Sequence, residues 1–137
     1  MDGYVQLLSA PVWAESGVEP HEIESPTWAD IEAAVRALDG RTRNDVYLTP
    51  DPNTPESYLA VAGGAENRYL VFICHNNEHF DEAITPDAAN STVDLVVGGQ
   101  LGEFNDGDLV TLDQALEAAR CFNENGRASE RIHWRHR

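Results

Sequence analysis

The segment YLVFIC, residues 69–74, is the most continuously apolar run in the chain and constrains the fold more than any other feature. A short apolar run of this kind indicates a strand that is covered on both faces. The preceding run SYLAVAGG, residues 57–64, ends in paired glycines only a few residues earlier. We therefore expect a β-hairpin with its turn at 63–67, and we place the strand at 69–74 at the centre of a sheet.

Two helices are predicted, one before and one after this region. The first begins near Ser25 or Thr27, either of which can cap the free amides of a first turn, and Gly40 ends it. The second begins after Thr111, which forms a capping-box pattern with Gln114, and it ends at the Asn-Gly pair that follows. In both helices apolar residues recur at three- and four-residue steps, which predicts one buried face. These residues are Trp28, Ile31, Ala34, Val35 and Leu38 in the first helix and Leu112, Ala115, Leu116, Ala119 and Phe122 in the second.

Two polar stretches interrupt the predicted elements. Residues 9–26 are expected to form an extended acidic connection, and residues 76–90 a long polar loop of the kind that is often functional. Helices grouped at the ends of a run of strands favour an α+β fold. We predict one domain over residues 1–137, with an antiparallel sheet of about five to six strands and two helices. Besides the hairpin, the predicted strands are residues 4–8, 45–50, 91–99 and 131–134.

The chain is strongly acidic. It has 24 acidic and 9 basic residues and a net charge of −15. This charge opposes direct binding to nucleic acid or to an anionic membrane, and it favours fast association with a basic partner. All basic residues are arginines, and five of the nine lie near the carboxyl end, at Arg120, Arg127, Arg131, Arg135 and Arg137.

The first residues, MDGYVQLLSAPVWAES, lack the basic segment and the long apolar core of a secretory signal. No run of about 18 apolar residues is present, so no membrane span is predicted. Cys74 and Cys121 lie within apolar patterns and do not form a disulfide framework. We therefore expect a cytoplasmic protein.

The segment VVGGQLGEFND, residues 96–106, resembles a phosphate-binding loop in its glycine content. A Walker loop needs a lysine, and the chain has none. Acidic residues follow Gly98, Gly99 and Gly102, and they would repel a phosphate. The glycines are therefore expected to form tight turns or a bulge between strands.

A possible metal site lies in ICHNNEHF, where Cys74, His75 and His79 bring thiol and imidazole groups together. Their spacing does not match the common zinc arrangements, and Cys74 is expected to point into the core. The chain also has no G-x-S-x-G nucleophile motif. We expect no enzyme, no catalytic residue, no cofactor and no metal, while a small metal-dependent enzyme using these three residues is kept as an alternative.

Two aromatic residues, Phe80 and Phe104, stand in otherwise polar segments that are rich in acids. Binding energy at protein interfaces concentrates in such aromatic anchors surrounded by polar contacts. The alternative for each ring is to close the end of the core. The candidate partner-binding residues are Glu78, Phe80, Asp81, Glu82, Glu103, Phe104, Asp106 and Asp108.

From about Trp28 to Trp134, the order of these landmarks resembles the Imm1 family of immunity proteins from bacterial polymorphic toxin systems. The similar segments are WADIEAAVRALDG, YLAVAGGAENRYLVF, VVGGQLGEF, LVTLDQALEAARCFNENGR and the closing IHW. The chain departs from the family pattern in having Arg135 after Trp134, where an acidic residue is frequent, and in lacking a proline near Asn105.

The resemblance implies a non-enzymatic protein that binds and neutralises a cognate toxin. Toxins encoded beside such proteins are often directed at nucleic acid and are commonly deaminases. An acidic inhibitor suits a basic, nucleic-acid-modifying partner, because opposite charges speed their encounter. We therefore hypothesise that the chain occludes the active site of its toxin. An acidic adaptor, which would bind a partner without inhibiting it, stays open as a further alternative.

Overall fold

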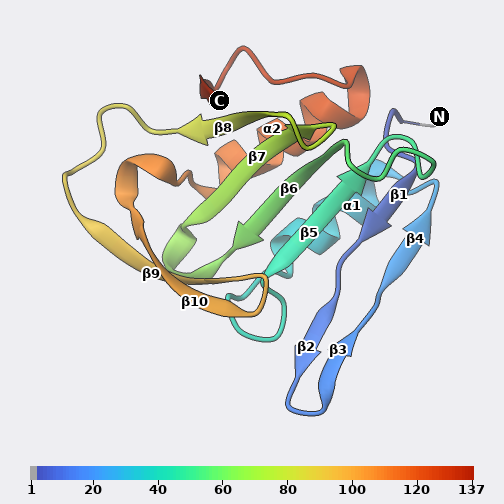
Figure 1. Ribbon diagram of the computed structural model, residues 1–137, viewed down its shortest axis with the longest axis horizontal. Coiled ribbons are helices and arrows are strands. Elements are labelled where there is room, and N and C mark those ends of the chain that lie inside the picture. Colours follow the sequence, from blue (N-terminus) through green and yellow to red (C-terminus); the bar gives the residue numbers. More distant parts are fainter. Residues whose placement is uncertain (1–2) are drawn as a thin grey trace.

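The computed structural model describes residues 3–137, and Figure 1 shows that its helices lie behind a broad sheet. Within these residues the main sheet has seven strands in the order β11-β8-β7-β6-β5-β1-β4, and neighbouring strands are antiparallel. The α+β class is thus confirmed, with more strands than the predicted five to six. The strands are β1 Leu7–Ser9, β4 Glu22–Glu24, β5 Asp45–Thr49, β6 Tyr58–Gly63, β7 Tyr69–His75, β8 His79–Ile84 and β11 His133–His136.

The two main-sheet strands that were not predicted, β4 and β8, come from the two stretches that were expected to be irregular. Residues 9–26 form the ribbon of β2 (Val12–Ala14) and β3 (Gly17–Glu19), which projects below the sheet in Figure 1, and then the edge strand β4. Residues 76–90 contain β8 and are not one long loop. The prediction failed at residues 17–24 because β3 and β4 are exposed and only three residues long, which is too short for apolar alternation to be recognised.

Helix α1, Trp28–Arg36, begins at the later of the two predicted positions. The Thr27 hydroxyl accepts a hydrogen bond from the Asp30 amide, and the Asp30 carboxylate accepts one from the Thr27 amide, at 3.2 and 2.9 Å. The helix ends earlier than predicted, because Ala37 is already its carboxyl cap. Gly40, with φ +71°, instead belongs to the loop that follows.

Helix α2, Leu112–Asn125, is confirmed at both ends. Thr111 and Gln114 form the predicted capping box, and Gly126 ends the helix in the left-handed conformation. Phe122, Ala115 and Ala119 are buried in the core that α2 shares with the sheet and α1. Neither helix is long and apolar enough to cross a membrane among the residues that the structure describes.

The hairpin of β6 and β7 is confirmed, and Ala65–Asn67 lies in its turn. The middle strand of the sheet is β6, and not the strand predicted from residues 69–74. In β6 every residue after Tyr58 is buried, whereas Leu70 and Phe72 of β7 are only half-buried. The difference arises because both helices pack on one face of the sheet and leave part of the opposite face open (Figure 1).

A second hairpin, β9 (Thr92–Val97) and β10 (Gln100–Asn105), crosses the end of the sheet near β6. Gly98 and Gly99 form its two-residue turn with φ +57° and +79°, as expected for a type I′ turn. The Gly99 amide donates to the Asn44 side chain at 2.9 Å, and Trp13 lies against the Gly99 backbone. The prediction of a structural turn is confirmed for Gly98 and Gly99, whereas Gly102 lies within strand β10, which was not predicted.

Candidate partner-binding surface

The face of the main sheet opposite the helices carries a continuous row of aromatic side chains. We call it the aromatic row; it consists of Tyr47 from β5, Tyr58 from β6, Phe72 from β7 and Phe80 from β8. Successive ring centroids are 5.7, 6.1 and 6.1 Å apart, in edge-to-face and tilted arrangements. All four side chains are half-buried. Contacts of this geometry are favourable between aromatic rings, so the row is an ordered surface.

The tyrosines of the row keep their hydroxyl protons. Burial raises the pKa of Tyr47, and its hydrogen bond to Asp45 raises it further. Burial, followed by the proximity of Cys74, raises the pKa of Tyr58. The buried Asp45 carboxylate also accepts a hydrogen bond from Trp13 Nε1 at 2.9 Å. The row therefore presents neutral rings and hydroxyl groups, and no ionised phenolate.

Only one of the three aromatic residues that face this side of β6–β8 was among the predicted binding residues. Phe80 was singled out because it stands among polar residues in the sequence. Phe72 lies within the run 69–74, which was predicted to be covered on both faces, and Tyr58 lies within the apolar run of the preceding hairpin strand. Period-two alternation assigns them to the face opposite Leu59 and Val71, but sequence alone does not show that this face lacks a covering layer.

The structure brings the two predicted acidic segments together. Arg135 of β11 joins Glu82 of β8, at 3.3 Å, to Asp108 of the short 3-10 turn Asp106–Asp108, at 2.9 Å. Arg137 Nε also contacts Glu82, at 2.7 Å, and Arg68 contacts Asp106 at the same distance. The side-chain hydrogen bond that Arg135 donates to Asp108 is the main cause that raises the pKa of Arg135. These carboxylates are therefore partly neutralised by arginines of the same chain.

Asp81 is separated from its predicted neighbours. Phe80, Asp81 and Glu82 lie in β8 and not in a loop, so their side chains alternate between the two faces of the sheet. Asp81 points to the helix-covered side, where His136 and His75 both contact its carboxylate. Burial raises the pKa of Asp81, but hydrogen bonds from both histidines outweigh this effect and hold the pKa below its ordinary value.

The other predicted residues also differ in their surroundings. Glu78 is exposed in the turn between β7 and β8. Glu103 is exposed on β10, whereas Phe104 and its cross-strand neighbour Val93 are half-buried. Phe104 thus packs within the hairpin of β9 and β10 and is not a fully exposed anchor.

Several carboxylates near the aromatic row have no ion-pair partner within residues 3–137. Glu22 and Glu24 lie on the edge strand β4, and the pairing of Ile23 with the buried Leu8 assigns both glutamates to the face of the aromatic row. Glu56 and Glu78 lie in neighbouring loops, which are joined by a 2.9 Å hydrogen bond from Ser57 to Asn76. We call Glu22, Glu24, Glu56 and Glu78 the carboxylate rim.

The proposed metal ligands do not converge. Cys74 is buried on the face of the aromatic row, where its Sγ contacts the Glu56 carbonyl at 3.3 Å and the Asn77 side chain at 3.4 Å. His75, the next residue of β7, lies on the opposite face, where it is paired with His79 of β8. Among the described residues, no group of three or more His, Cys, Asp or Glu side chains could hold a metal ion. The geometry does not support the metal-enzyme alternative.

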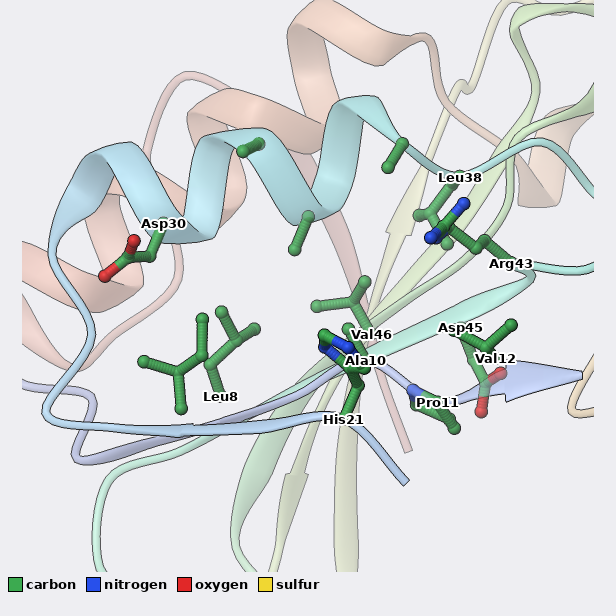
Figure 2. A pocket seen from close by; sticks show the side chains of 14 residues that line it. Leu8, Ala10, Pro11, Val12, His21, Asp30, Leu38, Arg43, Asp45 and Val46 are labelled. Carbon is green, nitrogen blue, oxygen red and sulfur yellow. The ribbon is translucent and has the colours of Figure 1, made fainter. Parts of the chain in front are cut away.

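The cavity shown in Figure 2 has a volume of about 240 Å³ and lies between α1 and strands β1 and β4. Its walls are mainly apolar, with Leu8, Leu38 and Val46 among them. Asp30 lies at one end of the cavity, and Arg43 and Asp45 lie at the other. His21 also lines the cavity, and among the described residues no hydrogen bond or ion pair joins its side chain to that of Asp30, Arg43 or Asp45. The cavity therefore shows no acid and base held together in the way that a catalytic centre requires.

Comparison with protein-family models identifies the family to which most of this chain corresponds. The model of the family described as immunity protein Imm1 matches residues 19–136. This span runs from the end of β3 to β11 and contains both helices. Comparison with curated proteins gave no match. The chain belongs to the Imm1 family of immunity proteins, and this membership supports an immunity function in which the chain binds and inhibits a cognate toxin.

Proposed function

We propose that this chain neutralises a nucleic-acid-modifying toxin, with a deaminase as the first candidate, by covering the active site of that toxin. The observation that carries the proposal is the net charge of −15 in a member of an immunity family, together with the unpaired carboxylate rim. Enzymes that grip nucleic acid use basic surfaces to hold phosphates. Carboxylates on the surface of the inhibitor can bind to this basic surface of the toxin in place of the phosphates.

The proposed interface contains the edge of the molecule around β8 and the 3-10 turn Asp106–Asp108. Glu78 lies in the turn before β8 and Glu103 lies on β10; both are exposed and have no ion-pair partner among the described residues. They can attract a basic toxin and contact its arginines or lysines. Glu82 and Asp108 already contact Arg135. Their proposed role is to hold β8, β11 and the 3-10 turn together, and to accept hydrogen bonds from the toxin with the carboxylate oxygens that these ion pairs leave free.

Inhibition in this proposal is steric and electrostatic and needs no bond-making step by the chain. The toxin would be bound in the cytoplasm of the producing cell, before it meets that cell's own nucleic acid. Within residues 3–137, the absence of a convergent metal cluster and the separated polar groups of the cavity are both compatible with a binding protein.

The first experiment is co-expression of the chain with the product of the gene immediately upstream, with growth and co-purification as the readouts. We expect rescue of growth and a stable one-to-one complex. Purified chain should then abolish the activity of the toxin on nucleic acid when the two proteins are equimolar. A complex that keeps full activity would support the acidic adaptor instead.

The occlusion mechanism has a separate test. A labelled, uncleavable oligonucleotide is titrated with the toxin in the absence and presence of the chain. If the carboxylates occupy the substrate-binding surface, the complex loses its affinity for the oligonucleotide. If the inactive complex binds the oligonucleotide as tightly as free toxin does, inhibition occurs at a distance from the active site.

A further inference from the structure

We propose that the aromatic row is the apolar centre of the interface with the toxin, and that it receives a large apolar side chain that is flanked on the toxin by arginines or lysines. This inference rests on the proposed function and adds to it the surface that is used. The carboxylate rim supplies the charged contacts around the row.

The rings of the row are already ordered in the free chain. Tyr58 has a ring neighbour on each side, Tyr47 at 5.7 Å and Phe72 at 6.1 Å. Beneath and beside the rings, the small residues Ala60 and Cys74 are only 2% and 1% exposed. Binding to such a surface requires little further loss of side-chain freedom, so more of the contact energy is available for affinity.

The row is also large and amphipathic enough to act as a binding centre. Aromatic side chains dominate the energetics of interfaces, and tyrosine adds a hydroxyl group that can bind polar atoms of the partner. Tyr47 and Tyr58 both keep a protonated hydroxyl. Because Phe80 belongs to the row, the surface is continuous with the edge at Glu82 and Asp108 that the proposed function assigns to the toxin.

The charges around the row specify the kind of partner. The rim carboxylates of Glu22 and Glu24 lie at one edge, and those of Glu56 and Glu78 lie at one end. The arginines nearest the row, Arg135 and Arg137, are held by Glu82 and Asp108. An apolar centre with a negative rim is complementary to an apolar residue with positive neighbours.

Two other occupants fit the surface less well. Aromatic rows can stack nucleobases, but the rim would repel the phosphates of a nucleic acid. A second copy of this chain would bring two rims of the same sign together, and each copy has a net charge of −15. A basic toxin is the occupant that can both pack an apolar side chain on the rings and pair positive charges with the carboxylate rim.

The test combines footprinting of the unaltered chain with affinity measurements on variants. Hydroxyl-radical labelling of free and toxin-bound chain should show protection of Tyr58 and Phe72 in the complex. Phe72→Ala and Tyr58→Ala should each weaken toxin binding by about 30-fold in calorimetric titrations, the loss typical of an aromatic hot spot. Circular dichroism and thermal melting establish that each variant is folded.

Trp28 offers a matched control. It is a half-buried aromatic residue at the start of α1 and packs against the core on the face of the sheet opposite the row. Trp28→Ala therefore removes a comparable ring contact away from the row. Its affinity for the toxin should stay within about twofold of the unaltered chain, and Trp28 should be labelled equally in both states.

The possible outcomes separate this inference from the proposed function. If the unaltered chain inhibits the toxin while Tyr58 and Phe72 gain no protection, the interface lies elsewhere and only this inference is overturned. Sedimentation that shows a dimer of the free chain, with Phe72→Ala monomeric, would assign the row to a second copy and overturn it equally. If the unaltered chain neither binds nor inhibits the toxin, both proposals fail.

Discussion

Gly98 and Gly99 form one hairpin turn, but their surroundings differ. Both have positive φ, at +57° and +79°. A side chain at Gly98 would meet open space, whereas one at Gly99 would overlap the Trp13 ring. We expect Gly99→Ala to lower the free energy of unfolding by about 3 kcal/mol, and Gly98→Ala by only about 1 kcal/mol. Urea denaturation of the two variants measures the difference.

The Trp13 contact is the reason for expecting unequal effects. If both variants lose the same stability, backbone strain alone explains the glycine pair and the packing of Trp13 contributes nothing measurable. Retention of toxin binding by folded Gly99→Ala would further agree with a structural role for the turn. A phosphate loop would instead lose its ligand through either substitution.

Asp81 gives the folded chain a dependence on pH. Its pKa in the folded chain is below the ordinary value of 3.8, because hydrogen bonds from His136 and His75 outweigh the effect of burial. The unfolded chain therefore binds more protons in this range, and stability falls as pH falls. The contribution is complete above the unfolded pKa and is lost as pH decreases through the lower, folded value.

Comparison of the unaltered chain with Asp81→Asn isolates this effect. The advantage of the unaltered chain should be present at about pH 5 and disappear towards about pH 2.5. It should not exceed about 1 kcal/mol, since His75 and His136 are substantially exposed and solvent weakens the pairs. An advantage that grows as the solution becomes more acidic would show that the histidines do not stabilise the carboxylate.

At the scale of whole elements, the second helix depends on its first cap. The hydroxyl of Thr111 accepts from the Gln114 amide, and the Gln114 side chain accepts from the Thr111 amide at 3.0 Å. Thr111→Ala should lower the free energy of unfolding by about 1 kcal/mol. Thr111→Ser keeps the acceptor and should recover most of the loss in thermal and chemical denaturation. Equal losses in both variants would assign the effect to the methyl group of threonine.

Local signals of this kind explain which elements could be predicted. The caps at Thr27 and Thr111 and the apolar faces of both helices depend on residues a few positions apart, so sequence alone locates them. Strand β4 is three residues long and exposed, and its pairing with β1 depends on partners that are distant in sequence. No local pattern distinguishes such a strand from an extended connection.

In the candidate surface, too, sequence identifies the residues whose role depends on near neighbours in the chain and misses those whose exposure depends on the packing of distant elements. Phe80 could be identified from its polar neighbours in the sequence. Tyr58 and Phe72 could not, because their exposure depends on both helices packing against the same face of the sheet. Likewise, sequence identifies the acids of residues 78–82 and 103–108, but only the fold shows that Arg135 joins Glu82 to Asp108.

At the scale of the whole molecule, the carboxylates that produce the net charge of −15 are not all equally free to pair with a partner. Asp81, Glu82, Asp106 and Asp108 contact arginines or histidines of the same chain. Glu78 and Glu103 have no such partner among the described residues and extend into solvent. Long-range attraction depends on the total field, but attraction near the interface depends most on the unpaired acids there.

We therefore expect the double variant Glu78→Gln, Glu103→Gln to associate with the toxin about threefold more slowly at low salt and to depend less on ionic strength. The control Asp113→Asn, Glu130→Gln removes the same charge from exposed acids of α2 and of the segment after it, away from the row. Stopped-flow association at several salt concentrations compares them. If Glu78 and Glu103 steer the toxin specifically, the first variant associates more slowly than the control. Equal reductions in both rates would assign the steering to the overall charge of the chain. If neither rate changes, electrostatic steering is excluded.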